Sequence, residues 1–208
     1  MADQLLAAIA THPLLTTSGT PLDPQVLFGD PTQGKTRVSV INFSGLGSDE
    51  SRQSFVNQLQ MALFTWIKKH PSPTGRLYAI DEAQNFAPSQ KTTPCKESTL
   101  ALATQARKYG LDMIFATQTP KAIDNKIISN CTTHFYGKMN APATIQAVRE
   151  LISMKGGSAD DVAALSAGVF YFATEGTAQP IKLRAPLCLS YHPKNPLAAE
   201  EVVRMARP

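Results

Sequence analysis

Residues 76–84, RLYAIDEAQ, decide the fold of this chain. Mostly apolar residues run directly into two neighbouring carboxylates, Asp81 and Glu82, and polar residues follow. Such a run is typical of a strand covered on both faces, as in a parallel sheet. In open α/β sheets the ligand crevice lies beyond the carboxyl ends of the strands. There, one acid would hold the water shell of Mg²⁺ and the other would activate an attacking water. The alternative is a strand that ends in a solvated acidic turn.

The composition of the 208 residues indicates a globular protein. Hydrophobic residues make up 43% of the chain and charged residues 17%, which suits one large domain or two small ones. No apolar run approaches the roughly 18 residues of a membrane span, and the N-terminus lacks the basic region of a secretory signal. The three cysteines and four histidines show no metal-ligand spacing. We therefore expect a cytoplasmic protein with reduced thiols.

The net charge of +4 and the pI of about 9.0 permit an acidic partner such as DNA. The basic residues are scattered along the sequence, with no basic run interleaved with aromatic residues. Lys121, Lys126 and Lys138 are candidates for DNA contacts. The alternative for all three is a solvated surface.

Strands and helices alternate on either side of the opening stretch. Strands are expected over residues 37–43, 77–80, 111–117, 132–138, 169–173 and 181–184, the last two as a hairpin, and helices over residues 49–69, 97–109, 142–154 and 158–165. A short helix is also expected over residues 1–10 and another near the C-terminus. This alternation predicts an α/β fold with a mostly parallel sheet and helices on both faces.

Residues 29–36, GDPTQGKT, satisfy the pattern G-x-x-x-x-G-K-[ST] through Gly29, Gly34, Lys35 and Thr36. The pattern binds phosphate only where a strand precedes it and a helix opens at its lysine. A proline-containing segment precedes it here and strand-forming residues follow. We favour a polar turn that leads into a strand, with a phosphate loop as the alternative.

Four motifs in order carry a resemblance to a known family. They are Asp81-Glu82-Ala83 after a strand, residues 106–111 (ARKYGL) at a helix end, residues 116–120 (ATQTP) after the next strand, and Asn130-Cys131. This order closely resembles the HerA/FtsK-type ATPases, which are RecA-like P-loop motors that form hexamers and translocate DNA and which include the VirB-type secretion ATPases. The match is best to the HerA-like bacterial ATP-binding proteins and covers roughly residues 36–185.

The resemblance implies a role for four residues. Asp81 looks like the Walker B aspartate that orients magnesium and its waters, and Glu82 looks like the catalytic glutamate that polarises the attacking water. Gln118 is similar to the sensor of the terminal phosphate. Arg107 resembles the arginine that a neighbouring subunit inserts into the site. The alternatives are a turn cap for Gln118 and a complement to a helix C-terminus for Arg107.

The chain also departs from the family. There, the phosphate loop and its strand lie far upstream of Walker B, and residues 34–46 correspond to a later strand. The resemblance therefore implies the C-terminal half of the motor, with Walker B but no true Walker A, and without the strand beside the Gln118 strand. Four explanations stay open: a truncated chain, a split gene whose other half supplies the loop, a rearranged self-contained fold, and association through the exposed sheet edge.

The function expected from these observations is that of an ATP-binding and ATP-hydrolysing part of a HerA-like DNA translocase or helicase. Its cofactors would be ATP and Mg²⁺, and its partners further copies of itself (a hexamer in the complete protein), the upstream ATPase half, and DNA. Residues 1–28 would be an arm or the remnant of an upstream element, residues 29–190 a partial ATPase domain, and residues 191–208 a tail helix. Alone, the chain would hydrolyse little ATP. Two alternatives remain: a non-catalytic assembly module, and a compact NTPase that uses residues 29–36 as its phosphate loop.

Overall fold

The computed structural model describes residues 22–29, 35–190, 195 and 197–206. The chain forms two compact units, Met1–Thr132 and Thr133–Pro208, which we call unit 1 and unit 2. The boundary between them falls inside the range that the sequence suggested for a single ATPase domain. The helix expected over residues 1–10 lies outside the described residues.

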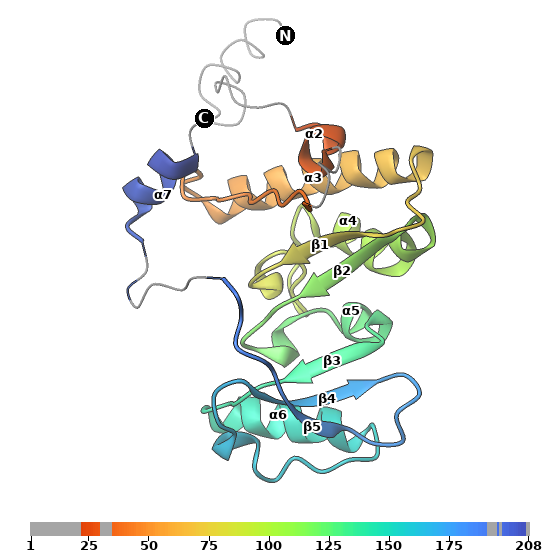
Figure 1. The fold of residues 1–208 in the computed structure, drawn as a ribbon, viewed down its shortest axis with the longest axis vertical. Coiled ribbons are helices and arrows are strands. Elements are labelled where there is room, and N and C mark those ends of the chain that lie inside the picture. Colours follow the sequence, from red (N-terminus) through yellow and green to blue (C-terminus); the bar gives the residue numbers. More distant parts are fainter. Residues whose placement is uncertain (1–21, 30–34, 191–194, 196, 207–208) are drawn as a thin grey trace, which may run out of the picture. The chain divides into compact units, whose positions relative to one another are not determined.

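Unit 1 alternates helices with two strands (Figure 1). Its elements are α2 (Pro24–Phe28), α3 (Asp49–Lys69), β1 (Arg76–Ile80), η1 (Ala83–Asn85), α4 (Lys96–Gln105), η2 (Ala106–Tyr109), β2 (Leu111–Phe115), η3 (Pro120–Ala122) and α5 (Asn125–Asn130). Ser48 caps α3, because its side chain accepts a hydrogen bond from the amide of Ser51. None of the described helices in either unit is both long and apolar enough to cross a membrane.

The two strands of unit 1 are parallel neighbours. Arg76 pairs with Leu111 and Ile80 pairs with Phe115, so the carboxyl ends of β1 and β2 lie side by side. This confirms the parallel sheet and the α/β class. The amide of Ala116 donates to the carbonyl of Ile80 and so extends the pairing just past both strands (2.9 Å).

One face of this sheet is packed and the other is open. Tyr78 of β1 and Met113 of β2 lie among the core residues contributed by α3 and α4. The alternate residues Leu77 and Ile114 are 58% and 51% exposed. The helices expected on the second face are therefore not found among the described residues of unit 1.

A buried glutamine joins α3 to α4 beneath the packed face. Gln60 is fully buried, and its side-chain oxygen accepts hydrogen bonds from Ser98 (2.8 Å) and Thr99 (2.9 Å). Its amide lies 3.5 Å from the hydroxyl of Tyr78, and burial raises the pKa of Tyr78 to about 12. A buried polar group costs stability unless it is hydrogen-bonded, so these bonds fix how the two helices pack.

The strand expected over residues 37–43 is not formed, and that prediction is wrong. The segment is neither helix nor strand, and Val38 and Val40 are 76% and 85% exposed. The hydroxyl of Ser39 holds it to the carbonyl of Leu27 (2.5 Å), and Phe43 packs against Phe86. Alternating β-branched residues favour a strand only where a neighbour supplies the hydrogen-bonding partners, and here the chain lies across a groove from β1.

Unit 2 is an antiparallel sheet covered by a helix (Figure 1). It contains β3 (Thr133–Tyr136), α6 (Pro142–Ser153), η4 (Val162–Ala164), β4 (Val169–Thr174), β5 (Ile181–Arg184) and α7 (Ala199–Ala206). The predicted hairpin is confirmed as β4–β5, and β3 pairs with the other side of β4. The helix expected over residues 158–165 is only the short 3₁₀ turn η4. Val148 and Ile152 of α6 pack on Tyr136 and Tyr171.

Candidate functional site

The candidate site lies where β1 and β2 end. Asp81 and Glu82 follow β1, and Gln118 follows β2 by three residues. The amide of Ala83 donates to the carbonyl of Ala116 (2.9 Å), so the two loops begin in contact. Because the strands are parallel neighbours, the three side chains emerge at the same edge of the sheet.

The structure brings Glu82 and Gln118 together. The side-chain amide of Gln118 donates to one oxygen of the Glu82 carboxylate (Nε2–Oε1, 2.5 Å). The side-chain amide of Gln84 donates to the other oxygen (Nε2–Oε2, 2.5 Å). The Glu82 carboxylate therefore accepts one hydrogen bond from its own loop and one from the loop after β2.

Thr117 completes this arrangement. Its hydroxyl lies 2.6 Å from the side-chain oxygen of Gln84 and 3.3 Å from the carbonyl of Thr119. Its oxygen also accepts the amide of Thr119 (3.1 Å). A chain of polar contacts thus runs from the loop after β2, through Thr117 and Gln84, to the carboxylate of Glu82.

Asp81 has a different environment from its neighbour. Its side chain is exposed, and one oxygen accepts the amide of Glu82 (2.9 Å). No other hydrogen bond or ion pair is recorded for this carboxylate among the described residues. It is thus free to accept hydrogen bonds from the waters of a hydrated cation, which is how Mg²⁺ is commonly held.

The backbone at Glu82 is unusual. With φ 48° and ψ 47° it is the non-glycine residue with positive φ among those described. A left-handed residue other than glycine costs about 1 kcal/mol or more. Here it turns the chain sharply out of β1 into η1, so the carboxylate of Glu82 faces the loop after β2.

An ion pair between Lys96 and Asp124 connects the start of α4 to the start of α5. The Lys96 ammonium lies 2.9 Å from the Asp124 carboxylate, and the two side chains are 14% and 15% exposed. Lys96 also donates to the carbonyl of Pro88 (2.7 Å), and Asp124 accepts the amide of Lys126 (2.8 Å) at the start of α5. Burial by itself would raise the pKa of Asp124, but the bonds from Lys96 and Lys126 outweigh it and the pKa is lowered.

Arg107 lies at the other end of the sheet. It is exposed in η2, just before β2 begins, whereas Glu82 follows the end of β1. The length of a five-residue strand, roughly 16 Å, separates the two ends. The structure therefore does not bring Arg107 to the acidic residues of its own chain.

The described part of the stretch GDPTQGKT, which is Gly29, Lys35 and Thr36, does not have the form of a phosphate loop. No helix opens at Lys35 and Thr36, and residues 35–43 form no regular structure. A Cβ at Gly29 would lie 3.3 Å from the Cγ of Arg37, and Gly34 lies outside the described residues. The structure therefore lacks the helix that a phosphate loop needs at its lysine.

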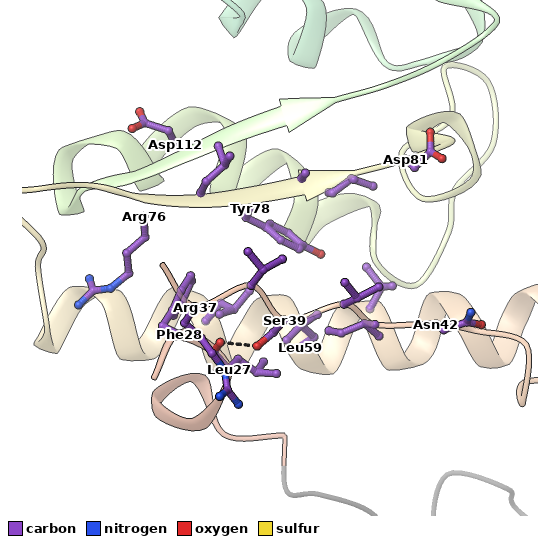
Figure 2. A pocket seen from close by; sticks show the side chains of 18 of the residues that line it. Leu27, Phe28, Arg37, Ser39, Asn42, Leu59, Arg76, Tyr78, Asp81 and Asp112 are labelled. Carbon is purple, nitrogen blue, oxygen red and sulfur yellow. Dashed lines mark hydrogen bonds between the residues drawn. The ribbon is translucent and has the colours of Figure 1, made fainter. Parts of the chain in front are cut away.

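A groove of about 1670 Å³ separates residues 35–43 from β1. Figure 2 shows α3 beneath it, Arg37 and Arg76 toward the amino end of β1, and Asp81 beyond its carboxyl end. In a parallel pair, alternate residues of each strand direct their main-chain groups to each side. Those of Leu77 and Ala79 therefore face this groove rather than β2.

The residues present fit part of a magnesium-nucleotide site. Asp81 and Glu82 offer oxygen, which Mg²⁺ prefers, and Gln118 offers an amide donor to a phosphate oxygen. No group of three or more metal-ligating side chains is found in the described ranges. This suits Mg²⁺, which keeps most of its waters and relies on the phosphates of its nucleotide. A loop that cradles those phosphates is not among the described residues beside the acids.

Three residues of this arrangement, Asp81, Glu82 and Gln118, were candidates from the sequence, and Gln84 and Thr117 were not. Glu82 and Gln118 could be paired because they follow adjacent parallel strands. Gln84 and Thr117 were visible as neighbours of those residues, two positions after Glu82 and one before Gln118. Their contact depends on how the two loops fold, and no pattern in the sequence indicates it.

Comparison with known proteins identifies a family. The family model described as Zonular occludens toxin (Zot) matches residues 31–150, which is more than half of the chain. No curated protein matches the chain.

Several solved structures share the fold. The genome packaging NTPase B204 from Sulfolobus turreted icosahedral virus 2, in complex with sulfate, is 18% identical with a TM-score of 0.57, over 83% of this chain and 74% of that one. The same protein in complex with ATP-gammaS is 21% identical with a TM-score of 0.55, over the same shares. B204, the DNA-packaging ATPase from Sulfolobus turreted icosahedral virus, is 18% identical with a TM-score of 0.51, over 82% and 74%. At these identities the likeness shows the fold alone.

Proposed function

The chain belongs to the Zonular occludens toxin (Zot) family, and from this premise we propose that it is the water-activating part of an ATP-hydrolysing motor. The motor would be of the kind found in HerA-like DNA translocases, and it would work in the cytoplasm. The contact between Glu82 and Gln118 carries the proposal, because it joins a carboxylate to a phosphate-reading amide at the mouth of a parallel sheet.

Glu82 would act as the group that polarises the attacking water. A carboxylate whose two oxygens are already placed by amide donors needs no large rearrangement to accept a hydrogen from water. Asp81 would hold the waters of Mg²⁺, and Gln118 would donate its amide to the terminal phosphate. Bound magnesium would supply positive charge against the phosphates.

The phosphate cradle would come from elsewhere, because the described residues beside Asp81 hold none. An upstream half of the motor or a second polypeptide would supply it. This chain alone would then bind ATP weakly and hydrolyse it slowly.

Arg107 would act on a neighbouring copy. Its position at the far end of the sheet from Glu82 supports a contact in trans, because the arginine of one subunit could reach the site of the next. The copies would form a ring, with six of them in the complete protein, as the family resemblance implies.

DNA would be the polymer that the motor moves. Four cations of unit 1 lie at or next to the amino ends of the strands, although Arg76 among them already donates to the carbonyl of His70 and stacks on Trp66. Lys68 and Lys69 end α3, Lys108 lies in η2, and Arg76 begins β1. The described ion pairs do not use these four side chains. They are better placed than Lys121, Lys126 and Lys138 for joint contact with a phosphate backbone.

The test is single-turnover hydrolysis of Mg-ATP at high concentrations of chain and nucleotide, which detects slow turnover, compared between Glu82→Gln and the control Glu97→Gln. Glu97 is an exposed acid in the first turn of α4. Glu82→Gln is expected to lower the rate by about 100-fold or more while ATP binding persists. Glu97→Gln should behave like the unmodified chain.

Three results would contradict the proposal. Turnover that survives Glu82→Gln would remove the site assignment, and loss of ATP binding in Lys35→Ala would favour the compact NTPase. A chain that binds no Mg-ATP, even with an upstream half added, would instead be an assembly module. The open sheet face at Leu77 and Ile114 is the observation that supports that second candidate.

A further inference from the structure

We propose that Gln84, held in place by Thr117, is a positioning residue for Glu82. This inference rests on the proposed function, since it explains how the water-activating carboxylate is aimed. Gln84 would keep that carboxylate in place when Gln118 leaves it to bind a phosphate.

The direction of each hydrogen bond follows from the chemistry of the groups. A carboxylate only accepts, so Gln84 must turn its NH₂ group toward Glu82. Its carbonyl oxygen then points the other way and needs a donor. The Thr117 hydroxyl is that donor at 2.6 Å, which is much closer than its other acceptor, the carbonyl of Thr119 at 3.3 Å.

Thr117 is itself held in place. Its oxygen accepts the amide of Thr119 (3.1 Å) while its proton goes to Gln84. The threonine thus selects one of the two orientations of the Gln84 amide, namely the one that offers NH₂ to Glu82. With a residue that lacks a hydroxyl at position 117, the side-chain amide of Gln84 could rotate by 180° and exchange its NH₂ group with its oxygen.

The two glutamines have different tasks. Gln118 is exposed and belongs to the loop after β2, so its amide can exchange a carboxylate partner for a phosphate oxygen. Gln84 is half-buried and belongs to the loop of Glu82 itself. When Gln118 turns away, one oxygen of Glu82 becomes free to accept from water and the other stays bound to Gln84. Without Gln84, the long glutamate side chain would regain its rotamer freedom at that moment.

A purely structural role does not account for these contacts. The core around η1 is formed by Ala83 and Phe86, and neither Gln84 nor Thr117 belongs to it. Both polar side chains are only half-buried, and apart from the local contacts of Thr117 with the main chain of Thr119 their hydrogen bonds go to each other and to Glu82. Their loss should therefore disturb the carboxylate far more than the fold.

The experiment compares Thr117→Val with Thr117→Ser in the full chain, with Thr104→Val as a control on α4. Thr117→Val keeps the shape of the side chain and removes the hydroxyl. NMR is expected to show the Gln84 side-chain amide protons exchanging with solvent about fivefold faster, because one hydrogen bond is lost. Thr117→Ser should recover most of that protection, and the melting temperature should change by no more than about 2 °C in any variant.

Single-turnover hydrolysis of Mg-ATP gives the second measurement. Thr117→Val and Gln84→Met are each expected to slow the step by about fivefold at saturating ATP, with the ATP concentration for half-saturation unchanged. Thr117→Ser should restore most of the rate. A rate effect without a binding effect is what positioning predicts, whereas a damaged fold would weaken both.

Three outcomes would overturn the inference. They are amide exchange unaffected by Thr117→Val, equal losses in Thr117→Ser and Thr117→Val, and a loss that appears as weaker ATP binding. The proposed function fails separately, if Glu82→Gln leaves hydrolysis intact. If Glu82→Gln stops hydrolysis and Thr117→Val does not slow it, only the positioning role of Gln84 is wrong.

Discussion

Gly110 shows how tightly a single residue can fix the start of β2. Its φ of 73° lies in the left-handed region, and a Cβ at this position would lie 2.0 Å from the carbonyl oxygen of Ser72. The amide of Ser72 donates to the carbonyl of Tyr109 (3.1 Å), so the main chains meet here without room for a side chain. The sequence places Gly110 at the end of this helix, in residues 106–111, but only the fold shows what lies against it.

Gly110→Ala is therefore expected to destabilise the chain by at least about 3 kcal/mol, because backbone strain and a main-chain clash add. The matched control is Gly176→Ala in the β4–β5 turn. Gly176 also has positive φ (89°), but a Cβ there would have nothing within 4 Å. The control should cost about 1 kcal/mol, from strain alone. Equal losses in urea unfolding would contradict the role of the clash.

At the scale of the elements, the pair Lys96–Asp124 joins the first residue of α4 to the residue that caps α5. Asp124→Asn keeps the hydrogen bond to the amide of Lys126 but removes the charge that faces Lys96. We expect a loss of about 1–2 kcal/mol at pH 7, since the pair is mostly shielded from water. Asp124→Ala, which also removes the helix cap, should cost about 1 kcal/mol more.

The pH dependence of this pair has a definite sign. The pKa of Asp124 is lower in the folded chain than its ordinary value of 3.8. The carboxylate therefore contributes stability above about pH 4, and this contribution is lost as the pH falls through the lowered pKa. The difference in unfolding free energy between the unmodified chain and Asp124→Asn should shrink below pH 4. An exposed control, Asp112→Asn, should show a difference of less than about 0.5 kcal/mol throughout.

Sequence patterns predicted the elements that depend on local features and failed for one that depends on a neighbouring strand. The helix over residues 49–69 was predictable because its apolar stripe and its Ser48 cap are local features. The strands that end at Asp81 and before Gln118 were predictable because their apolar runs are bounded by polar residues. Residues 37–43 have equally strong strand chemistry, yet they lie apart from β1, because pairing depends on a neighbour that no local pattern supplies.

At the scale of the whole molecule, each unit leaves an apolar sheet face open. In unit 1 the face holds Leu77 and Ile114, and in unit 2 it holds Phe135 and Ile181, at 58% and 51% exposure. Phe135 also lies 5.1 Å from Phe172 of the neighbouring strand, measured between ring centres. On the unit 1 face the exposed Asp112 pairs with Leu77, so a carboxylate lies beside the apolar side chains. Exposed apolar faces commonly mark an interface.

We expect the chain to self-associate through these faces. The double variants Leu77→Thr with Ile114→Thr, and Phe135→Thr with Ile181→Thr, should each lower the fraction of associated chain in sedimentation velocity at a fixed concentration. Their unfolding midpoints should change little, because the side chains are already in water. Sedimentation that is the same for all variants would exclude both faces as contacts.

The left-handed backbone of Glu82 restricts what can ever replace that residue. Valine, isoleucine and threonine are barred by their branching whatever their polarity, while glycine, asparagine and aspartate are conformationally acceptable but cannot reach both glutamines. Among the remaining amino acids, glutamine comes nearest in length and shape, and it lacks the negative charge. In a library of all nineteen substitutions of Glu82, the ranking of the variants by thermal stability should therefore show no correlation with their ranking by ATP turnover.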